Sequence, residues 1–182
     1  MYTKYLLYNV PSRESRPISA MRAPKVRLNQ FSNYAIRILM YAGMHGDRPS
    51  AVPVIARAYN ISFNHLKKAA SELCRLGYLE AVRGRVGGVR LARPAGDIVI
   101  GEVVRQTEGS VVLVECFDPA TNTCPLMPAC RLKRALGEAL TAFFAVLDGY
   151  TLADLIAEPE ELALLLGINS GAANATATPN DS

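Results

Sequence analysis

Three of the four cysteines lie close together in the second half of the chain, at Cys116, Cys124 and Cys130. Seven residues separate the first two and five separate the last two. In a reducing compartment, thiols grouped in this way favour metal or redox chemistry over a structural disulfide. A set of three also leaves one thiol over after any single disulfide. The segment therefore predicts a metal centre or a redox site.

The spacing of these cysteines bears on which metal they would hold. Soft thiolate ligands select zinc, copper(I) or an iron–sulfur cluster, and zinc ligands usually come in pairs about two to four residues apart. The gaps here are longer and irregular, which favours an iron–sulfur cluster, and a 4Fe-4S cluster over a 2Fe-2S cluster. Three thiolates would leave one iron open to small molecules, as suits a sensor. Zinc, bare redox thiols and an incidental grouping remain alternatives.

The charge of the chain is divided unevenly. Residues 21–94 carry a net charge of +10, whereas residues 95–182 carry −8. A basic half beside an acidic half indicates that the first half binds a polyanion. An uneven but merely solvated surface is the alternative interpretation.

The basic half has the pattern of a helix-turn-helix. Apolar residues recur at helical spacing over residues 29–45, a short helix over 51–59 has Ser50 as a candidate N-cap, and a third helix follows Ser62 and ends at Gly77. The third helix has an apolar face and a polar face, so it is the predicted recognition helix. A solvated amphipathic helix is the alternative. Its candidate DNA-binding residues are Ser62, Asn64, His65, Lys67 and Lys68.

The segment after this helix, "YLEAVRGRVGGVRLA" at 78–92, predicts a β-hairpin with a glycine-rich turn. It would present Arg83, Arg85 and Arg90 to DNA as the wing of a winged helix, with the helix in a major groove and the arginines on phosphates or in a minor groove. A phosphate-binding loop for a nucleotide is a weaker alternative, because these glycines do not lead from a strand into a helix.

The second half should begin with a short helix after Pro94, capped by Asp97 or Gly101, before the cysteine segment. A longer helix is expected from Cys130 to about Leu147. Two short acidic helices at its end could pack against it. The apolar residues of the long helix recur at intervals of 4, 3, 4 and 3, which is the spacing of a coiled-coil seam. We interpret it as a dimerisation helix, a core helix being the alternative. The seam residues are Leu132, Leu136, Ala139, Phe143 and Val146.

The predicted fold is therefore mainly α with a small β-hairpin: a winged helix-turn-helix DNA-binding domain plus a long dimerisation helix. We assign the DNA-binding domain to residues 27–94, and the cluster-binding loop and dimerisation helices to 95–168. Residues 1–26 are expected to be a disordered extension and 169–182 a disordered tail.

Other classes of protein fit the sequence less well. No apolar run reaches the roughly 18 residues of a membrane span, so we expect a cytoplasmic protein without a membrane partner. We predict no enzymatic activity, because the chain has no paired carboxylates and no nucleophile–base constellation. Its two histidines, His45 and His65, lie in separate helical segments.

Several motifs then carry a family resemblance over about residues 27–166. They include "RGRVGGVRLARP", "CPLMPACRLKRAL" and "YTLADL". The chain resembles the nitric-oxide-sensing repressors among the bacterial iron–sulfur winged-helix regulators. The resemblance implies a homodimer that binds double-stranded operator DNA while Cys116, Cys124 and Cys130 hold an intact iron–sulfur cluster. Nitric oxide would nitrosylate the cluster, release the DNA and derepress nitric-oxide detoxification genes.

The fourth cluster ligand departs from the family pattern. Such repressors can use an aspartate near the start of the first helix, reaching across from the partner subunit, and the matching residue here is Asn33. Related cluster-biogenesis regulators use a histidine after the third cysteine, which this chain lacks. Asn33, a nearby carboxylate such as Glu115 or Asp118, or an exogenous thiol or water are the candidates.

Two other functions are also compatible with the sequence. One is a regulator of the same family that responds to iron–sulfur status or redox stress. The other, from a different class, is a cluster-containing electron-transfer component. The basic hairpin "RGRVGGVR" argues against the second.

Overall fold

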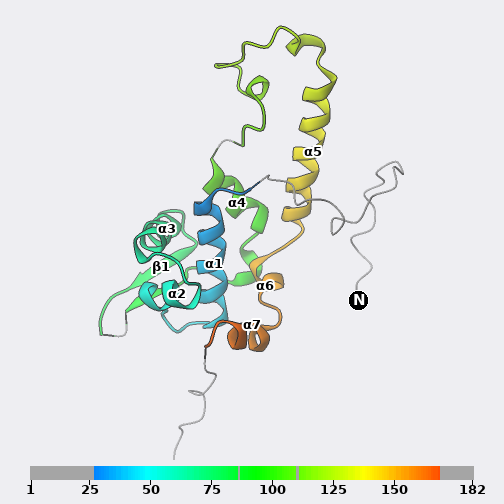
Figure 1. The fold of residues 1–182 in the computed structure, drawn as a ribbon. Coiled ribbons are helices and arrows are strands. Elements are labelled where there is room, and N and C mark those ends of the chain that lie inside the picture. Colours follow the sequence, from blue (N-terminus) through cyan, green and yellow to red (C-terminus); the bar gives the residue numbers. More distant parts are fainter. Residues whose placement is uncertain (1–26, 86, 110, 169–182) are drawn as a thin grey trace, which may run out of the picture.

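The computed structural model describes residues 27–85, 87–109 and 111–168 (Figure 1). The predicted disorder of residues 1–26 and 169–182 lies outside these ranges. The described part is mainly helical with one hairpin, as predicted. Its helices are α1 (Gln30–Met44), α2 (Val52–Ala58), α3 (Phe63–Arg75), α4 (Ile100–Glu108), α5 (Arg131–Asp148), α6 (Leu152–Leu155) and α7 (Pro159–Leu165). The strands are β1 (Leu79–Val82) and β2 (Gly88–Leu91), and short 3-10 turns are η2 (Ala95–Asp97), η3 (Glu115–Phe117) and η4 (Met127–Ala129).

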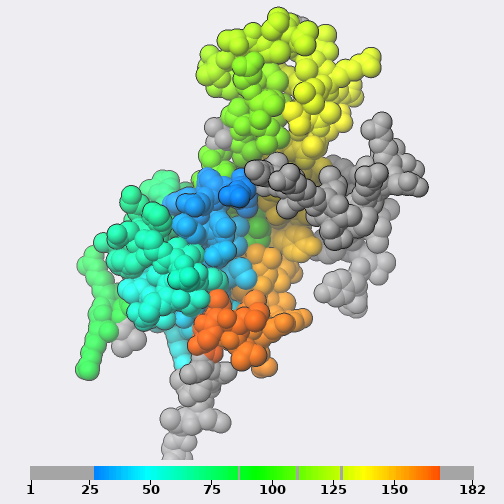
Figure 2. All heavy atoms as spheres, in the orientation of Figure 1, coloured from blue at the N-terminus to red at the C-terminus, as the bar shows by residue number. Residues whose placement is uncertain are grey.

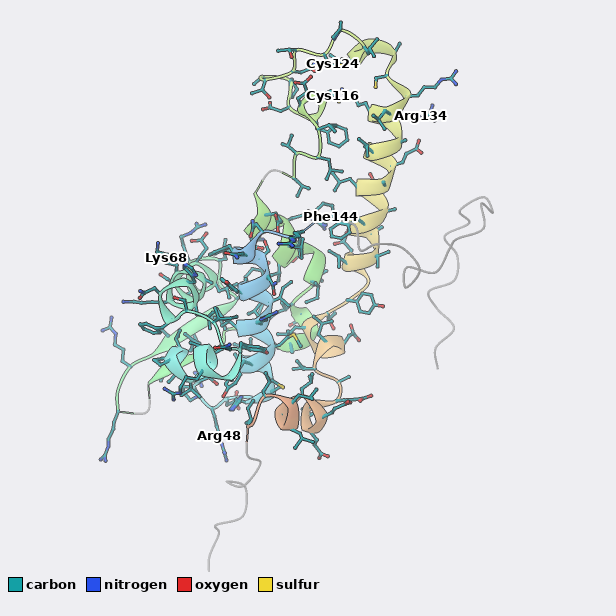
Figure 3. All side chains as sticks on the ribbon, viewed as in Figure 1. Arg48, Lys68, Cys116, Cys124, Arg134 and Phe144 are labelled. Carbon is teal, nitrogen blue, oxygen red and sulfur yellow. The ribbon has the colours of Figure 1, made fainter. Side chains whose placement is uncertain are left out.

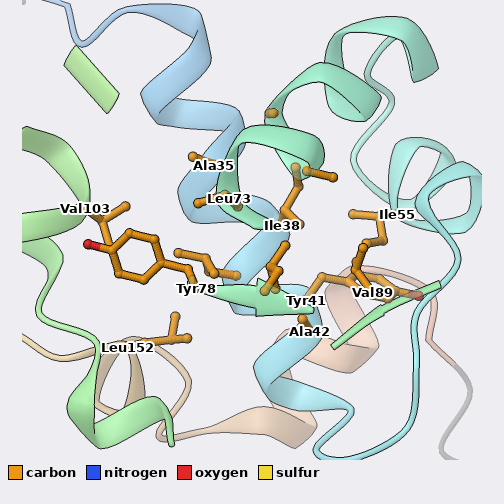
Figure 4. Packing of buried hydrophobic residues seen from close by; sticks show 14 of the residues in the cluster. Ala35, Ile38, Tyr41, Ala42, Ile55, Leu73, Tyr78, Val89, Val103 and Leu152 are labelled. Carbon is orange, nitrogen blue, oxygen red and sulfur yellow. The ribbon is translucent and has the colours of Figure 1, made fainter. Parts of the chain in front are cut away.

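The core surrounds α1, which packs against α3, β2, α4 and α6. Ile38 of α1 and Leu73 of α3 are fully buried together with Tyr78, which precedes β1 (Figure 4). Val103 of α4 and Leu152 of α6 are buried in the same cluster. One hydrophobic core thus joins the winged helix to elements that follow residue 94.

The hairpin is antiparallel, with Leu79 opposite Leu91 and Val82 opposite Gly88. A further bridge extends it, because the backbone N–H of Ser50 donates to the carbonyl of Val89 at 2.8 Å and the N–H of Val89 donates to the carbonyl of Ser50 at 2.9 Å. The prediction of Ser50 as the N-cap of α2 was therefore wrong. Ala51 is the N-cap, because Ser50 is held in extended pairing with β2.

The start of α4 was also predicted wrongly. Its N-cap is Val99; Asp97 belongs to η2 and Gly101 lies inside the helix. Backbone pairing with the segment after α5 fixes this start: the Ile100 N–H donates to the Tyr150 carbonyl at 2.9 Å, and the Leu152 N–H donates to the Ile98 carbonyl at 2.8 Å. This contact between distant segments has no local sequence signal.

Helix α5 and the cysteine segment extend away from the winged helix (Figures 1 and 2). The lower part of α5 packs against α4, and the segment between α4 and α5 runs out along the upper part. None of the side chains described in α5 is buried. Helix α6 packs on α1 and η2. Among the described helices, none is both long enough and apolar enough to cross a membrane.

The close approach of β2 to the Ser50 bridge yields a stability prediction. A Cβ at Gly88 would collide with the backbone of Ser50 and Ala51, whereas one at Gly96 would meet nothing within 4 Å. We expect Gly88→Ala to lower the free energy of unfolding by about 1–3 kcal/mol. Gly96→Ala, the control, should change it little. Urea unfolding followed by circular dichroism measures both, and equal midpoints for the two variants would contradict the strand packing.

Candidate DNA-binding surface and cysteine loop

Helix α3 presents a polar face to solvent. Its inward residues, including Leu66, Ala70 and Leu73, are buried at helical spacing against α1 and β1. The predicted recognition residues are all exposed: Ser62, Asn64, His65, Lys67 and Lys68. Ser62 stands at the N-cap position without a side-chain capping hydrogen bond. The surface has the polar and basic character that contacts with bases and phosphates require.

Helix α1 contributes to this surface, which the sequence reasoning missed. The ring of Tyr34 stacks on that of His65, with centroids 6.1 Å apart and planes 17° from parallel. Gln30, Phe31, Tyr34, His65 and Lys68 line a hollow of about 200 Å³ between the two helices. Gln30 and Tyr34 are four residues apart at the polar start of the predicted first helix, so they lie on one face of it. This spacing was the sequence signal that could have placed them together on the surface.

The wing arginines differ in their surroundings. Arg83 and Arg85 are exposed, whereas Arg90 forms an ion pair with Glu80. This pair follows from the register, because Glu80 and Arg90 lie directly opposite each other in the hairpin. Arg90 therefore already has an acidic partner on the protein. Arg83 and Arg85 are the better candidates for contact with phosphate.

The three clustered cysteines lie on one segment beside the far end of α5, with Cys116 and Cys124 at a distance from Lys68 of the recognition helix (Figure 3). We call residues 111–130 the cysteine loop. Cys116 lies in η3, and Cys130 is the N-cap of α5. The backbone N–H of Lys133 donates to Cys130 Sγ at 3.4 Å. This contact satisfies one of the backbone N–H groups that have no partner within the helix at its start.

The thiols of the loop are unpaired and half-buried. They do not converge: among the residues that the structure describes, no three His, Cys, Asp or Glu side chains are placed to hold one metal ion. Cys74 lies apart on α3 against the hydrophobic core, and burial raises the pKa of its thiol. A neutral, partly buried thiol suits a packing role.

The candidate fourth ligands have other contacts. The carboxylate of Asp118 accepts hydrogen bonds from the Ala120 N–H and the Thr121 hydroxyl, both at 2.9 Å. Glu115 is exposed on η3. Asn33 is exposed on α1, outside the loop. Its predicted role requires a second subunit, so the geometry of one chain leaves that role a prediction.

Comparison with known proteins identifies the family. The Rrf2 family, described as an iron-dependent transcriptional regulator, matches residues 28–158. This chain belongs to the Rrf2 family of transcriptional regulators. Its Rrf2 relatives include the HTH-type transcriptional regulator NsrR of Halalkalibacterium halodurans, 49% identical over 142 residues, which cover 78% of this chain and 97% of the relative. NsrR of Bacillus subtilis is 46% identical over 144 residues, which cover 78% of this chain and 97% of the relative.

Solved structures agree with the fold. CymR, the global cysteine regulator of B. subtilis, superposes with a TM-score of 0.60 at 25% identity, covering 72% of this chain and 97% of its own. IscR of T. potens gives a TM-score of 0.61 at 24% identity, and the match covers 76% of this chain and 91% of the IscR chain. The predicted winged-helix architecture is thereby confirmed, and the identities to NsrR proteins confirm the family resemblance. The chain is a transcriptional regulator with a winged-helix fold, and its relatives are transcriptional regulators, which is a non-enzymatic role.

The candidate DNA surface yields a prediction that separates its residues by role. Lys68→Ala should weaken binding to specific and random duplexes alike and lower the salt dependence by about one ion, because a lysine contact to phosphate reads no sequence. Asn64→Ala should instead relax base preference, by about 1–3 kcal/mol at one position.

Both variants can be measured by fluorescence anisotropy on a duplex selected by the protein from a random pool, over a range of salt concentrations. Arg134→Ala on α5, where Arg134 pairs with Glu138, removes one positive charge far from the surface and serves as the control. An equal effect from Lys68→Ala and Arg134→Ala would argue against a specific role for α3.

Proposed function

We propose that this regulator is a repressor that binds operator DNA as a homodimer, and that an iron–sulfur cluster held by Cys116, Cys124 and Cys130 controls its affinity for DNA. Nitric oxide is the proposed signal. The observation that carries the proposal is a loop with three unpaired thiols in an Rrf2 regulator whose relatives include several NsrR proteins.

The chemistry of the loop fits such a cofactor. Its three soft donors lie within fifteen residues, and thiolates are the ligands that bind iron–sulfur clusters. No described side chain between residues 111 and 130 is buried, so the loop has no hydrophobic core of its own to fix its shape. A long loop without such a core is usually functional. Binding of a cofactor would supply the missing cross-links and bring the three sulfurs together.

The cofactor would supply iron that reacts with nitric oxide. Around it, the chain supplies the backbone N–H of Lys133, which donates to Cys130 Sγ, and the side chain of Lys133. This basic side chain offsets part of the negative charge of three thiolates. A 4Fe-4S cluster bound by three cysteines has one iron without a cysteine ligand, where Asn33 of the partner subunit is the proposed neighbour.

The exposed surface of α5 supports the homodimer. Leu132 is 63% exposed, Phe143 43% and Val146 58%, and all three belong to the predicted seam. Phe144 and Leu147, on the adjacent face, pack against the core of the same chain. One face of α5 is therefore used within the subunit, while the seam presents apolar side chains to solvent. Exposed apolar surface of this extent marks an interaction site, and a second α5 offers the matching seam.

The same site could respond to other signals. Iron limitation or peroxide would also act through the reactivity of a bound cluster, so a regulator of iron–sulfur status or redox stress is the second candidate. The iron dependence in the description of the Rrf2 family supports this second candidate. Operator occupancy measured after nitric oxide, peroxide and iron chelation separates the two candidates.

Reconstitution tests the cofactor. Anaerobic loading with iron and sulfide should give a brown protein with broad visible absorption, and nitric oxide should bleach it and release DNA. Cys124→Ala should abolish the colour, because one of three thiolate ligands is lost. Cys74→Ser, the control, should retain it, since Cys74 lies on α3. A colourless protein that binds DNA equally well before and after loading would refute the proposal.

Charge on the seam tests the dimer. Phe143→Asp should convert the dimer to monomer and weaken operator binding at least tenfold, because each subunit would bury a carboxylate against the other. Ala145→Asp, also exposed, adds the same charge on the opposite side of α5 and should leave the dimer intact. Sedimentation velocity reports the oligomeric state. A Phe143→Asp protein that remains dimeric would place the interface elsewhere.

A further inference from the structure

Two buried hydroxyl groups join the start of α1 to the end of α4. Ser32 is 0% exposed and Thr107 8%. Their hydroxyl oxygens lie 2.8 Å apart, and Thr107 Oγ1 also lies 2.7 Å from the Val103 carbonyl oxygen. Because a threonine hydroxyl carries one hydrogen, it donates to the carbonyl and accepts from Ser32. Each hydroxyl is shielded from water, so separating them would leave polar groups unsatisfied.

Asn29 strengthens this junction from the N-cap of α1. Its side-chain oxygen accepts from the Ser32 N–H at 2.7 Å, and its amide nitrogen donates to the Thr107 carbonyl at 3.2 Å. Its backbone N–H donates to the Glu108 carboxylate at 2.8 Å. We call the buried pair Ser32 and Thr107 the α1–α4 latch, and Asn29 and Glu108 add hydrogen bonds at its edge.

The latch lies between the two candidate sites. Glu108 is the last residue of α4, and the cysteine loop begins three residues later. On its other side, the latch holds the first turn of α1, and Tyr34 in the next turn stacks on His65 of α3. Two kinds of contact therefore connect the cysteine loop with the exposed face of α3. Hydrogen bonds join the end of α4 to the start of α1, and the ring of Tyr34 on α1 contacts that of His65 on α3.

We propose that the α1–α4 latch transmits the state of the cysteine loop to the recognition helix. The proposal rests on the proposed function for its natural signal, the cofactor. A change in loop shape pulls on the end of α4. Apolar side chains can slide past one another with little directional cost, but buried hydrogen bonds cannot lengthen without losing their partners. The start of α1 therefore moves with α4 and carries Tyr34 against His65.

A paired substitution removes the latch with little damage to the fold. In Ser32→Ala/Thr107→Val both hydroxyls disappear, so neither partner is left unsatisfied, and valine keeps the shape of threonine. Thr141→Val is the matched control. Among the described residues, Thr141 Oγ1 bonds the Gly137 carbonyl of its own helix, at 2.9 Å, so this change repeats the chemistry without a contact between helices. All proteins carry Cys74→Ser, which leaves thiols only in the loop.

The loop is perturbed in two independent ways: by anaerobic loading with iron and sulfide, and by alkylation of its thiols with N-ethylmaleimide. Affinity for a duplex selected from a random pool is measured before and after each treatment. With an intact latch, and in the Thr141→Val control, we expect a shift of about fivefold or more. In the latch variant we expect the shift to fall within about twofold, while thermal unfolding and iron content stay unchanged.

The outcomes separate the two proposals. A shift on alkylation but not on loading, lost in the latch variant, would refute the cofactor and support the latch. A shift of equal size with and without the latch would overturn the latch and leave the cofactor standing. If neither treatment shifted the affinity of the protein with an intact latch, the loop would not communicate with DNA and the latch proposal would be wrong as well.

Discussion

The structure depends on α1 being packed between two sets of elements. It packs on α3 and β2 in one direction and on α4 and α6 in the other, and its residues Ile38, Leu39 and Ala42 are fully buried. A helix enclosed in this way is in close contact with all of these neighbours, since protein interiors are close-packed. The DNA-binding surface and the element that leads into the cysteine loop are thus parts of one core, although they are far apart in the sequence.

The distribution of charge also favours one orientation of the protein relative to DNA. The basic residues of the winged helix, among them Lys67, Lys68 and Arg85, are exposed on α3 and the wing. The acidic residues of α6 and α7, including Asp154 and Glu160, are exposed on elements at the other end of the chain. Hydrogen bonds from the backbone and side chain of Thr151 lower the pKa of Asp154, so it keeps its charge. The negative charge on α6 and α7 repels the phosphates of DNA, and this favours an approach in which the basic winged helix faces the DNA.

The sequence predicted the elements whose signals are local. Helix α3 and its exposed polar face follow from helical spacing, and its end at Arg75, two residues before the predicted Gly77, follows from that glycine, which has a positive φ. The hairpin and α5 follow in the same way from alternation and from the regular apolar intervals. What could not be predicted depends on contacts between distant segments. Ser50 pairs with β2, Val99 pairs with Thr151, and Thr107 meets Ser32, and none of these pairs has a periodic pattern.

The proposed function assigns partners to the cysteine loop and to the seam of α5, and these two parts are continuous in the chain because Cys130 caps α5. Their physical situations differ. The seam is a preformed helical surface that a second copy could cover without rearrangement, so dimerisation needs little ordering. The loop has two short 3-10 turns and no buried described side chain, so under the proposed function the free energy that fixes its shape comes from the cofactor bound to its thiols. A rigid element joined to one whose shape depends on a ligand is the arrangement that a sensor requires, because the ligand can then change the geometry without unfolding the core.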